Sequence, residues 1–164
     1  MIKYYRQVDT YSCGPIAILN AVKWAGFDNF DDEDFLKQIR IVTKCKTQGG
    51  VTNKNLDVGV RSRPELQIMK RMDSPGMIDV RKAIDKGYGI ILVHKNKHSW
   101  IKGHVVFIAS RCENNYLIAN QSHEFGKQSA ETITSVVLSK LMRAGNKSRR
   151  FKPTAIFVRR NPNA

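Results

Sequence analysis

The chain has 164 residues, of which 41% are hydrophobic and 26% are charged; this ordinary globular usage excludes a mostly disordered chain. Its length predicts a single domain over residues 1–164 with one sizeable core. Lysine and arginine number 28 against 14 acidic residues, and the net charge of +14 favours either an acidic partner (nucleic acid, an anionic surface or an acidic protein) or a role in solubility alone.

The first residues and the cysteines bear on the compartment. The opening MIKYYRQVDT lacks the apolar segment of a signal peptide, and no run of about 18 apolar residues predicts a membrane span. These features predict a cytoplasmic location. The three cysteines (Cys13, Cys45 and Cys112) include no CxxC pair, which argues against a disulfide framework and against a structural zinc site.

The first predicted element is a helix over residues 13–25. Only two positions within Ile16–Ala25 are polar, so this helix is apolar on nearly all sides, as is typical of a helix in the protein core. Ser12 can cap its start, Pro15 suits its first turn, and Gly26 can end it.

The remaining elements follow with helices mainly in the first half and strands in the second. This order predicts an α+β fold with helices packed against one antiparallel sheet. In chain order we expect a helix over 32–42, a short helix capped by Thr52, an edge strand over 65–72, a helix over 77–87, strands over 88–94, 103–111 and 115–121, a helix over 133–145 and a strand over 154–160.

Cys13 stands at the start of the predicted core helix and has two interpretations. The positive end of the helix dipole lowers the pKa of a thiol there, toward the reactive thiolate. Gly14 and Pro15 keep the first turn slim enough for a substrate to approach. The alternative is a small buried residue, which is the common fate of a free cysteine.

Three further residues form a site with Cys13 if simple strand pairing holds. His104 opens one apolar strand and Asn120 ends the next, so the open end of their hairpin brings the two side by side. An imidazole oriented in this way can serve as the base for a thiol nucleophile. Gln7, six residues before Cys13, can offer its side-chain NH2 beside the backbone N–H of Cys13 as an oxyanion hole.

Each of these residues also has a purely structural interpretation: His104 as a hydrogen-bonded histidine at a sheet edge, Asn120 as a turn residue and Gln7 as an exposed polar residue. His94 and His98 are four residues apart, a metal-binding spacing on a helix. They fall where a strand passes into a loop, so we predict no metal site.

The pattern Q-x5-CG, an apolar helix, a GHVV strand and a strand ending in Asn resembles the papain-like cysteine peptidases. Within them it resembles the bacteriocin-leader (double-glycine) peptidases, over roughly Tyr4 to Gln121. The resemblance implies a papain-like fold with Cys13 as nucleophile, His104 as base, Asn120 as the residue that orients it and Gln7 as oxyanion donor. Asn120 stands where leader peptidases usually have Asp; papain itself has Asn.

The expected function is therefore a thiol hydrolase that cleaves peptide, isopeptide or related amide bonds in a protein or peptide substrate, without a cofactor. Deamidation and acyl transfer on the same scaffold stay open. We expect Gly14 and Gly103 to border the substrate, with Trp100 either lining a groove or anchoring its loop. The alternative is a binding module with a vestigial site, whose basic surface holds nucleic acid or an acidic protein.

Overall fold

The computed structural model describes residues 2–7, 9–95, 103–120, 129–143 and 152–164. Trp100 and His98 lie outside these ranges. The described elements are α1 (Cys13–Trp24), α2 (Asp32–Val42), α3 (Asn53–Arg61), β1 (Leu66–Asp73), α4 (Met77–Asp85), β2 (Gly89–Lys95), β3 (Gly103–Cys112), β4 (Asn115–Ala119), β5 (Ala130–Thr134), α5 (Ser135–Arg143) and β6 (Thr154–Arg160).

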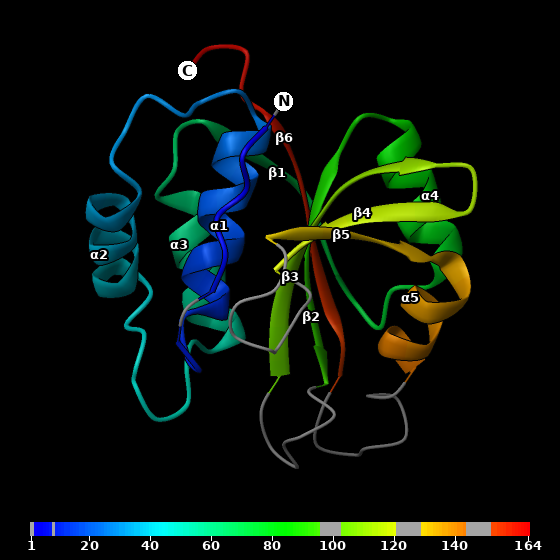
Figure 1. Cartoon of the computed structure of the whole chain (residues 1–164), viewed down its shortest axis with the longest axis horizontal. Helices are drawn as coiled ribbons and strands as arrows, with labels where there is room; N and C mark the ends of the chain where they lie inside the picture. The colour runs from blue at the N-terminus through cyan, green and yellow to red at the C-terminus, as the bar shows by residue number, and fades with distance from the viewer. Residues whose placement is uncertain (1, 8, 96–102, 121–128, 144–151) are drawn as a thin grey trace.

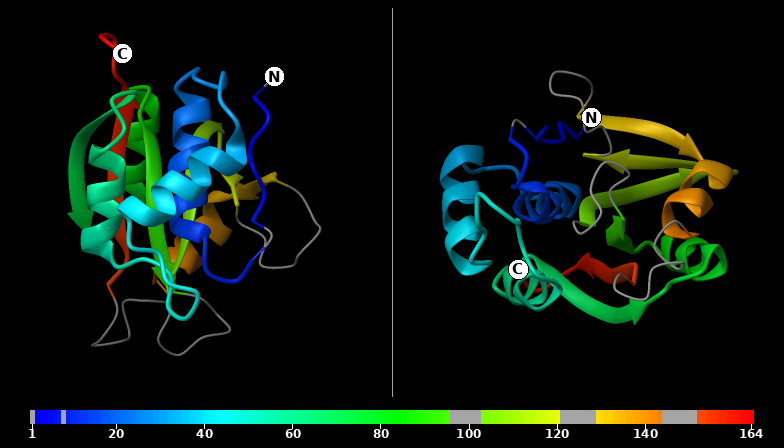
Figure 2. Two further views of the ribbon diagram at one scale, coloured as in Figure 1. Left: turned by 90° about the vertical axis from the view of Figure 1, so that its left-hand side faces the viewer. Right: turned by 90° about the horizontal axis from the view of Figure 1, so that it is seen from below.

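The strands form one sheet in the order β1-β6-β2-β3-β4-β5, and each pairing between the described strands is antiparallel. Helices α1, α2 and α3 lie on one side of it, and α4 and α5 lie on the other (Figures 1 and 2). The predicted α+β class with an antiparallel sheet is therefore confirmed. No helix in the described ranges is long and apolar enough to cross a membrane.

Two apolar layers explain why the central strands are hydrophobic along their whole length. Side chains of β2 and β3 alternate between a core beneath α1 and a second core beneath α4 and α5. A strand that is covered on both faces reads as a continuous apolar run rather than an alternating one. The segment 130–134, predicted in part as the start of a helix, instead forms β5 at the sheet edge, and α5 begins directly after it.

Helix α1 begins at Cys13 as predicted, and it is buried from Gly14 to Val22. Gly26 ends it with a φ of 92°, which favours glycine. The predicted cap is wrong. The Ser12 side chain makes no capping hydrogen bond to α1 and donates its hydroxyl to Asp9 instead.

The segment before α1 runs back alongside that helix (Figure 1) and is tied to it by a buried asparagine. Asn20, fully buried on the α1 surface, accepts a hydrogen bond from the backbone N–H of Tyr5 at 2.7 Å and donates one to the Tyr5 carbonyl at 3.1 Å. Asn20 thus binds both the backbone N–H and the backbone carbonyl of Tyr5, which lies outside the described strands. These two bonds fix the path of the segment toward Gln7.

Replacement of Asn20 by leucine should therefore destabilise the fold by about 2–4 kcal/mol, because it leaves two backbone groups of Tyr5 without partners. The measurement is chemical denaturation monitored by circular dichroism. The exposed Asn29 provides the matched control, and Asn29→Ala should change the free energy of unfolding by less than about 0.5 kcal/mol. Equal stabilities for the two variants would contradict this role of Asn20.

Candidate active site

The predicted site residues within the described ranges lie in two adjoining places, Cys13 in the first turn of α1, and His104 and Asn120 at the open end of the β3–β4 hairpin. The regular pairing of β3 with β4 ends at Phe107 and Ala119. Beyond that point the strands are joined by Asn120, whose side-chain amide donates to the carbonyl of Val105 at 3.4 Å. The backbone N–H of Val105 faces the sulfur of Cys13. The thiol thus lies near the start of β3, against the residue that follows His104 in the sequence.

Cys13 is partly accessible to solvent, and its ionisation differs from the prediction. Burial raises the pKa of the Cys13 thiol above its ordinary value, whereas the N–H groups of Val105, Gly14 and Cys13 itself lower it by a smaller amount. The charge of Asp9 adds to the rise. The N–H groups at the helix terminus therefore lower the pKa of Cys13 as expected, but burial raises it by more. The thiol consequently needs a base to become nucleophilic near neutral pH.

His104 is buried and held by two contacts at the start of β3. Its Nε2 lies 2.7 Å from the backbone carbonyl oxygen of Asn120. Its ring meets the ring of its cross-strand neighbour His94 at 5.5 Å between centroids, nearly edge to face. Val105 packs on the α1 side of the sheet and Val106 on the α4 side. Side chains alternate along a strand, so the side chain of His104 leaves the backbone on the α4 side.

Asn120 reaches His104 through its backbone rather than through its side chain. Its φ of 65° is left-handed, a conformation that asparagine tolerates, and its carbonyl faces the imidazole. A carbonyl oxygen can only accept, so Nε2 carries a hydrogen and donates this hydrogen bond. The predicted pairing of these two residues is thus present, with a different atom of Asn120 as the partner.

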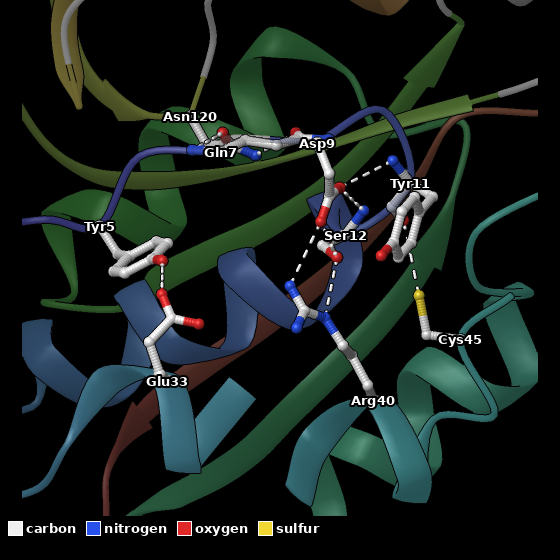
Figure 3. Close-up of polar contacts among 9 residues, drawn as sticks. All are labelled: Tyr5, Gln7, Asp9, Tyr11, Ser12, Glu33, Arg40, Cys45 and Asn120. Atoms are coloured by element: carbon white, nitrogen blue, oxygen red, sulfur yellow. Dashed lines mark hydrogen bonds and ion pairs between the residues drawn. The ribbon is translucent and has the colours of Figure 1, made fainter. Parts of the chain in front are cut away.

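Gln7 is bound to Asn120 by two hydrogen bonds, drawn together in Figure 3. The backbone N–H of Gln7 donates to Asn120 Oδ1 at 3.3 Å, and Asn120 Nδ2 donates to Gln7 Oε1 at 3.1 Å. These bonds join residues that are 113 positions apart in the chain. The bond to Gln7 Oε1 holds the Gln7 amide in place. The NH2 group is the donor of this amide and is therefore the part that can bind an oxyanion.

Three residues that the sequence does not assign to the site form a cluster around Ser12, the residue that precedes Cys13. Asp9, Ser12 and Arg40 form a hydrogen-bonded cluster across the start of α1 and the last turn of α2 (Figure 3). The pattern Asp9-Thr10-Tyr11-Ser12 could have suggested part of it, because an aspartate often accepts hydrogen bonds from the backbone two and three residues later. Nothing in the sequence marks Arg40, which is 28 residues beyond Ser12.

The loop after α2 covers the other side of the first turn. Cys45 Sγ lies 3.5 Å from the carbonyl of Tyr11, and burial raises the pKa of the Cys45 thiol to about 11. A Cβ added at Gly14 would meet Val51 at 3.2 Å. The small size of Gly14 therefore accommodates the packing of Val51.

The other predicted site residues are placed as follows. Gly103 opens β3 opposite Lys95, and its contact with substrate stays a prediction. His94 is buried in β2, within the strand predicted over 88–94, and its ring meets that of His104. No group of three or more His, Cys, Asp or Glu that could hold a metal ion occurs among the residues that the structure describes.

The fold can now be compared with those of known proteins. No family model and no curated protein sequence matches the chain. Among solved structures, it is similar to the peptidase domain of Streptococcus ComA, a bifunctional ABC transporter involved in a quorum-sensing pathway, with a TM-score of 0.66 and 16% identity over 98% of this chain and 100% of that one. It is also similar to the peptidase domain of Streptococcus mutans ComA, with a TM-score of 0.57 and 14% identity over 95% and 98% of the two chains. The protein therefore has the papain-like fold of the ComA peptidase domains, in agreement with the resemblance in its sequence.

Proposed function

We propose that the protein is a cysteine-dependent hydrolase of peptide or related amide bonds, with Cys13 as nucleophile and His104 as base. The observation that carries this proposal is the position of the Cys13 sulfur against the backbone N–H of Val105, the residue that follows His104 in β3. The peptidase fold of the similar structures supports it independently. The raised pKa of the Cys13 thiol is consistent with this proposal, because a buried thiol needs a base to become a nucleophile near neutral pH.

In the proposed reaction, His104 accepts the proton of Cys13 through Nδ1 while Nε2–H remains bonded to Asn120. The imidazole must turn around the start of β3, away from His94, for Nδ1 to reach the sulfur. The thiolate attacks the carbonyl carbon, the C–N bond breaks, and the His104 proton passes to the leaving amine. Water, deprotonated by His104, then breaks the thioester to give a carboxylic acid and the free thiol.

The oxyanion of each tetrahedral intermediate receives two hydrogen bonds in this proposal, from the side-chain NH2 of Gln7 and from the backbone N–H of Cys13. The bond between Gln7 Oε1 and Asn120 supports this role because it fixes the orientation of the amide before substrate binds. Donors held in place in this way stabilise the transition state without reorganisation. The same machinery serves deamidation or acyl transfer if the leaving group or the acceptor differs, so peptide hydrolysis is the reaction to test first.

Alkylation by iodoacetamide, with labelling at each cysteine measured by mass spectrometry, tests the nucleophile. Cys13 should react in a His104-dependent manner at pH 7, and His104→Ala should slow its labelling by about 100-fold or more. Exposed Cys112 is the reference within the same molecule, and its rate should not change. Equal labelling of Cys13 in wild type and His104→Ala would contradict the proposed base.

Replacement of Gln7 by glutamate tests the oxyanion hole, because it keeps an oxygen for Asn120 but removes the NH2 donor. Cleavage of an oligopeptide library should fall by about 100-fold, while alkylation of Cys13 should change little, since alkylation forms no oxyanion. The products are quantified by mass spectrometry. Parallel losses in both assays would show that Gln7 acts by shaping the site rather than as an oxyanion donor.

The pH dependence follows from the burial of the thiol. Because the pKa of Cys13 is raised, less thiolate is present at neutral pH, and reactivity must increase as the pH rises. In His104→Ala, where no base assists, the alkylation rate of Cys13 should rise with a midpoint above the ordinary thiol value of 9.0. A midpoint below that value would show that the local N–H groups, and not burial, dominate.

We infer a second, binding function from a groove on the opposite face of the sheet. It has a volume of about 280 Å³ and an apolar floor with a basic rim, and it is lined by Met69, Lys70, Met72, Asp79, Lys82, Ala83, Lys86, Tyr88 and Phe157. A bulge in the pairing of β1 with β6, between Ile68 and Lys70, allows Met69 and Met72 to face this same side although they are three positions apart. Three lysines and one aspartate around methionine side chains favour an acidic peptide segment that carries apolar residues.

Fluorescence polarisation with a labelled octapeptide of alternating glutamate and leucine tests this groove. The triple variant Lys70→Glu, Lys82→Glu and Lys86→Glu should weaken binding at least tenfold. A matched reversal of the exposed Lys3, Lys37 and Lys54 should weaken it much less. Equal losses would refute the groove, and tighter binding of duplex DNA that both variants weaken equally would assign the charge to nucleic acid instead.

A further inference from the structure

The first turn of α1 lacks the cap that its sequence predicts, and the reason is a cluster of three residues. We propose that Asp9, Ser12 and Arg40 form a positioning unit with two effects. It leaves the N–H groups of Cys13 and Gly14 available to the reacting atoms, and within it Arg40 shields the thiol from the carboxylate charge of Asp9. The inference rests on the proposed function of Cys13 as nucleophile.

Asp9 binds the two backbone N–H groups that lie just before the helix. Its Oδ1 accepts from Tyr11 at 2.9 Å and from Ser12 at 2.6 Å. The hydroxyl of Ser12 donates to Asp9 Oδ2 at 2.6 Å and accepts from Arg40 Nε at 3.0 Å. Ser12 is fully buried, so its hydroxyl is held in this arrangement and is directed away from the helix N–H groups that a serine cap normally binds.

Because the Ser12 hydroxyl binds Asp9 and does not cap the helix, the first N–H groups of α1 can face the site. Pro15 has no N–H, so those of Cys13 and Gly14 are the first two that the helix can offer. Both lower the pKa of the Cys13 thiol, which places them toward its sulfur. The N–H of Cys13 is also a donor in the proposed oxyanion hole. A Ser12 side chain in the usual capping position would compete for the N–H of Gly14, because a cap binds the second or third helical residue and the third, Pro15, has no N–H.

Arg40 completes the unit through its charge. The carboxylate of Asp9 raises the pKa of Cys13, and Arg40 Nη2 forms an ion pair with Asp9 Oδ2 at 3.2 Å. Burial alone would raise the pKa of Asp9, but its hydrogen bonds and Arg40 together lower it, so Asp9 stays ionised at neutral pH. Among the described residues, Cys45 of the loop after α2 is a further titratable group close enough to Cys13 for their charges to interact, and His104 of β3 precedes Val105, whose N–H faces the sulfur.

The test is the pH profile of Cys13 alkylation by iodoacetamide in the full chain. In Arg40→Gln the unopposed charge of Asp9 should move the profile to higher pH and slow labelling at pH 7 by about three- to tenfold. In Asp9→Asn the profile should move to lower pH and labelling should be faster by about threefold. General loosening of the fold would not give shifts of opposite sign.

Two further variants separate charge from structure. Arg40→Lys keeps the charge but loses the planar fork, and it should leave the profile close to that of wild type. Arg71→Gln removes a different ion pair, with Asp57, on β1, which β6 and β2 separate from β3. It makes the same change in net charge and should leave the profile unchanged.

Several outcomes would overturn the positioning unit. These are a profile in Arg40→Gln that superimposes on wild type, the same shift in Arg71→Gln, or shifts of the same sign in Arg40→Gln and Asp9→Asn. If Arg40→Gln does not fold, Asp9→Asn and Arg40→Lys still decide. The proposed function fails by a different result, the loss of His104 dependence, while the titration of Cys13 continues to report on Asp9 and Arg40.

Discussion

The burial of α1 on all sides is the constraint on which the rest of the structure depends. A helix with no solvent face cannot turn about its axis or slide along it without opening a void, so the position of its first residue is determined by packing along its whole length. That residue is Cys13. The sheet on one side and α2 and α3 on the other thus hold a potentially reactive thiol at a defined point, with no contribution needed from the thiol itself.

The segment that leads into α1 shows how polar contacts complete what packing begins. It has no sheet partner, yet it is attached at three successive points, by Asn20 at Tyr5, by Asn120 at Gln7 and by Arg40 at Asp9. Each contact comes from a different element, so the segment joins α1, the β3–β4 hairpin and α2 around the thiol. The site is therefore a junction of the fold rather than a feature of one loop.

Much of this could be predicted from the sequence, because periodicity and local pairing depend on neighbouring residues. The bounds of α2, the cap at Thr52 and the proximity of His104 to Asn120 follow from such local rules. The sign of the Cys13 pKa shift could not be predicted, since it depends on burial by elements far along the chain. Arg40 was missed for the same reason, and Ser12 was misassigned because a distant arginine and Asp9 outcompete its local cap.

The place of β6 in the sheet has a consequence for how the protein matures. β6 lies between β1 and β2, although it is the last strand in the chain. During synthesis β1 and β2 therefore have no common neighbour until residues 154–160 have left the ribosome, and the sheet beneath α1 cannot close before then. The pairing of β2 with β3 and of β3 with β4 needs no part of β6, so the part of the sheet against which the Cys13 thiol lies can form before β1 is joined to it.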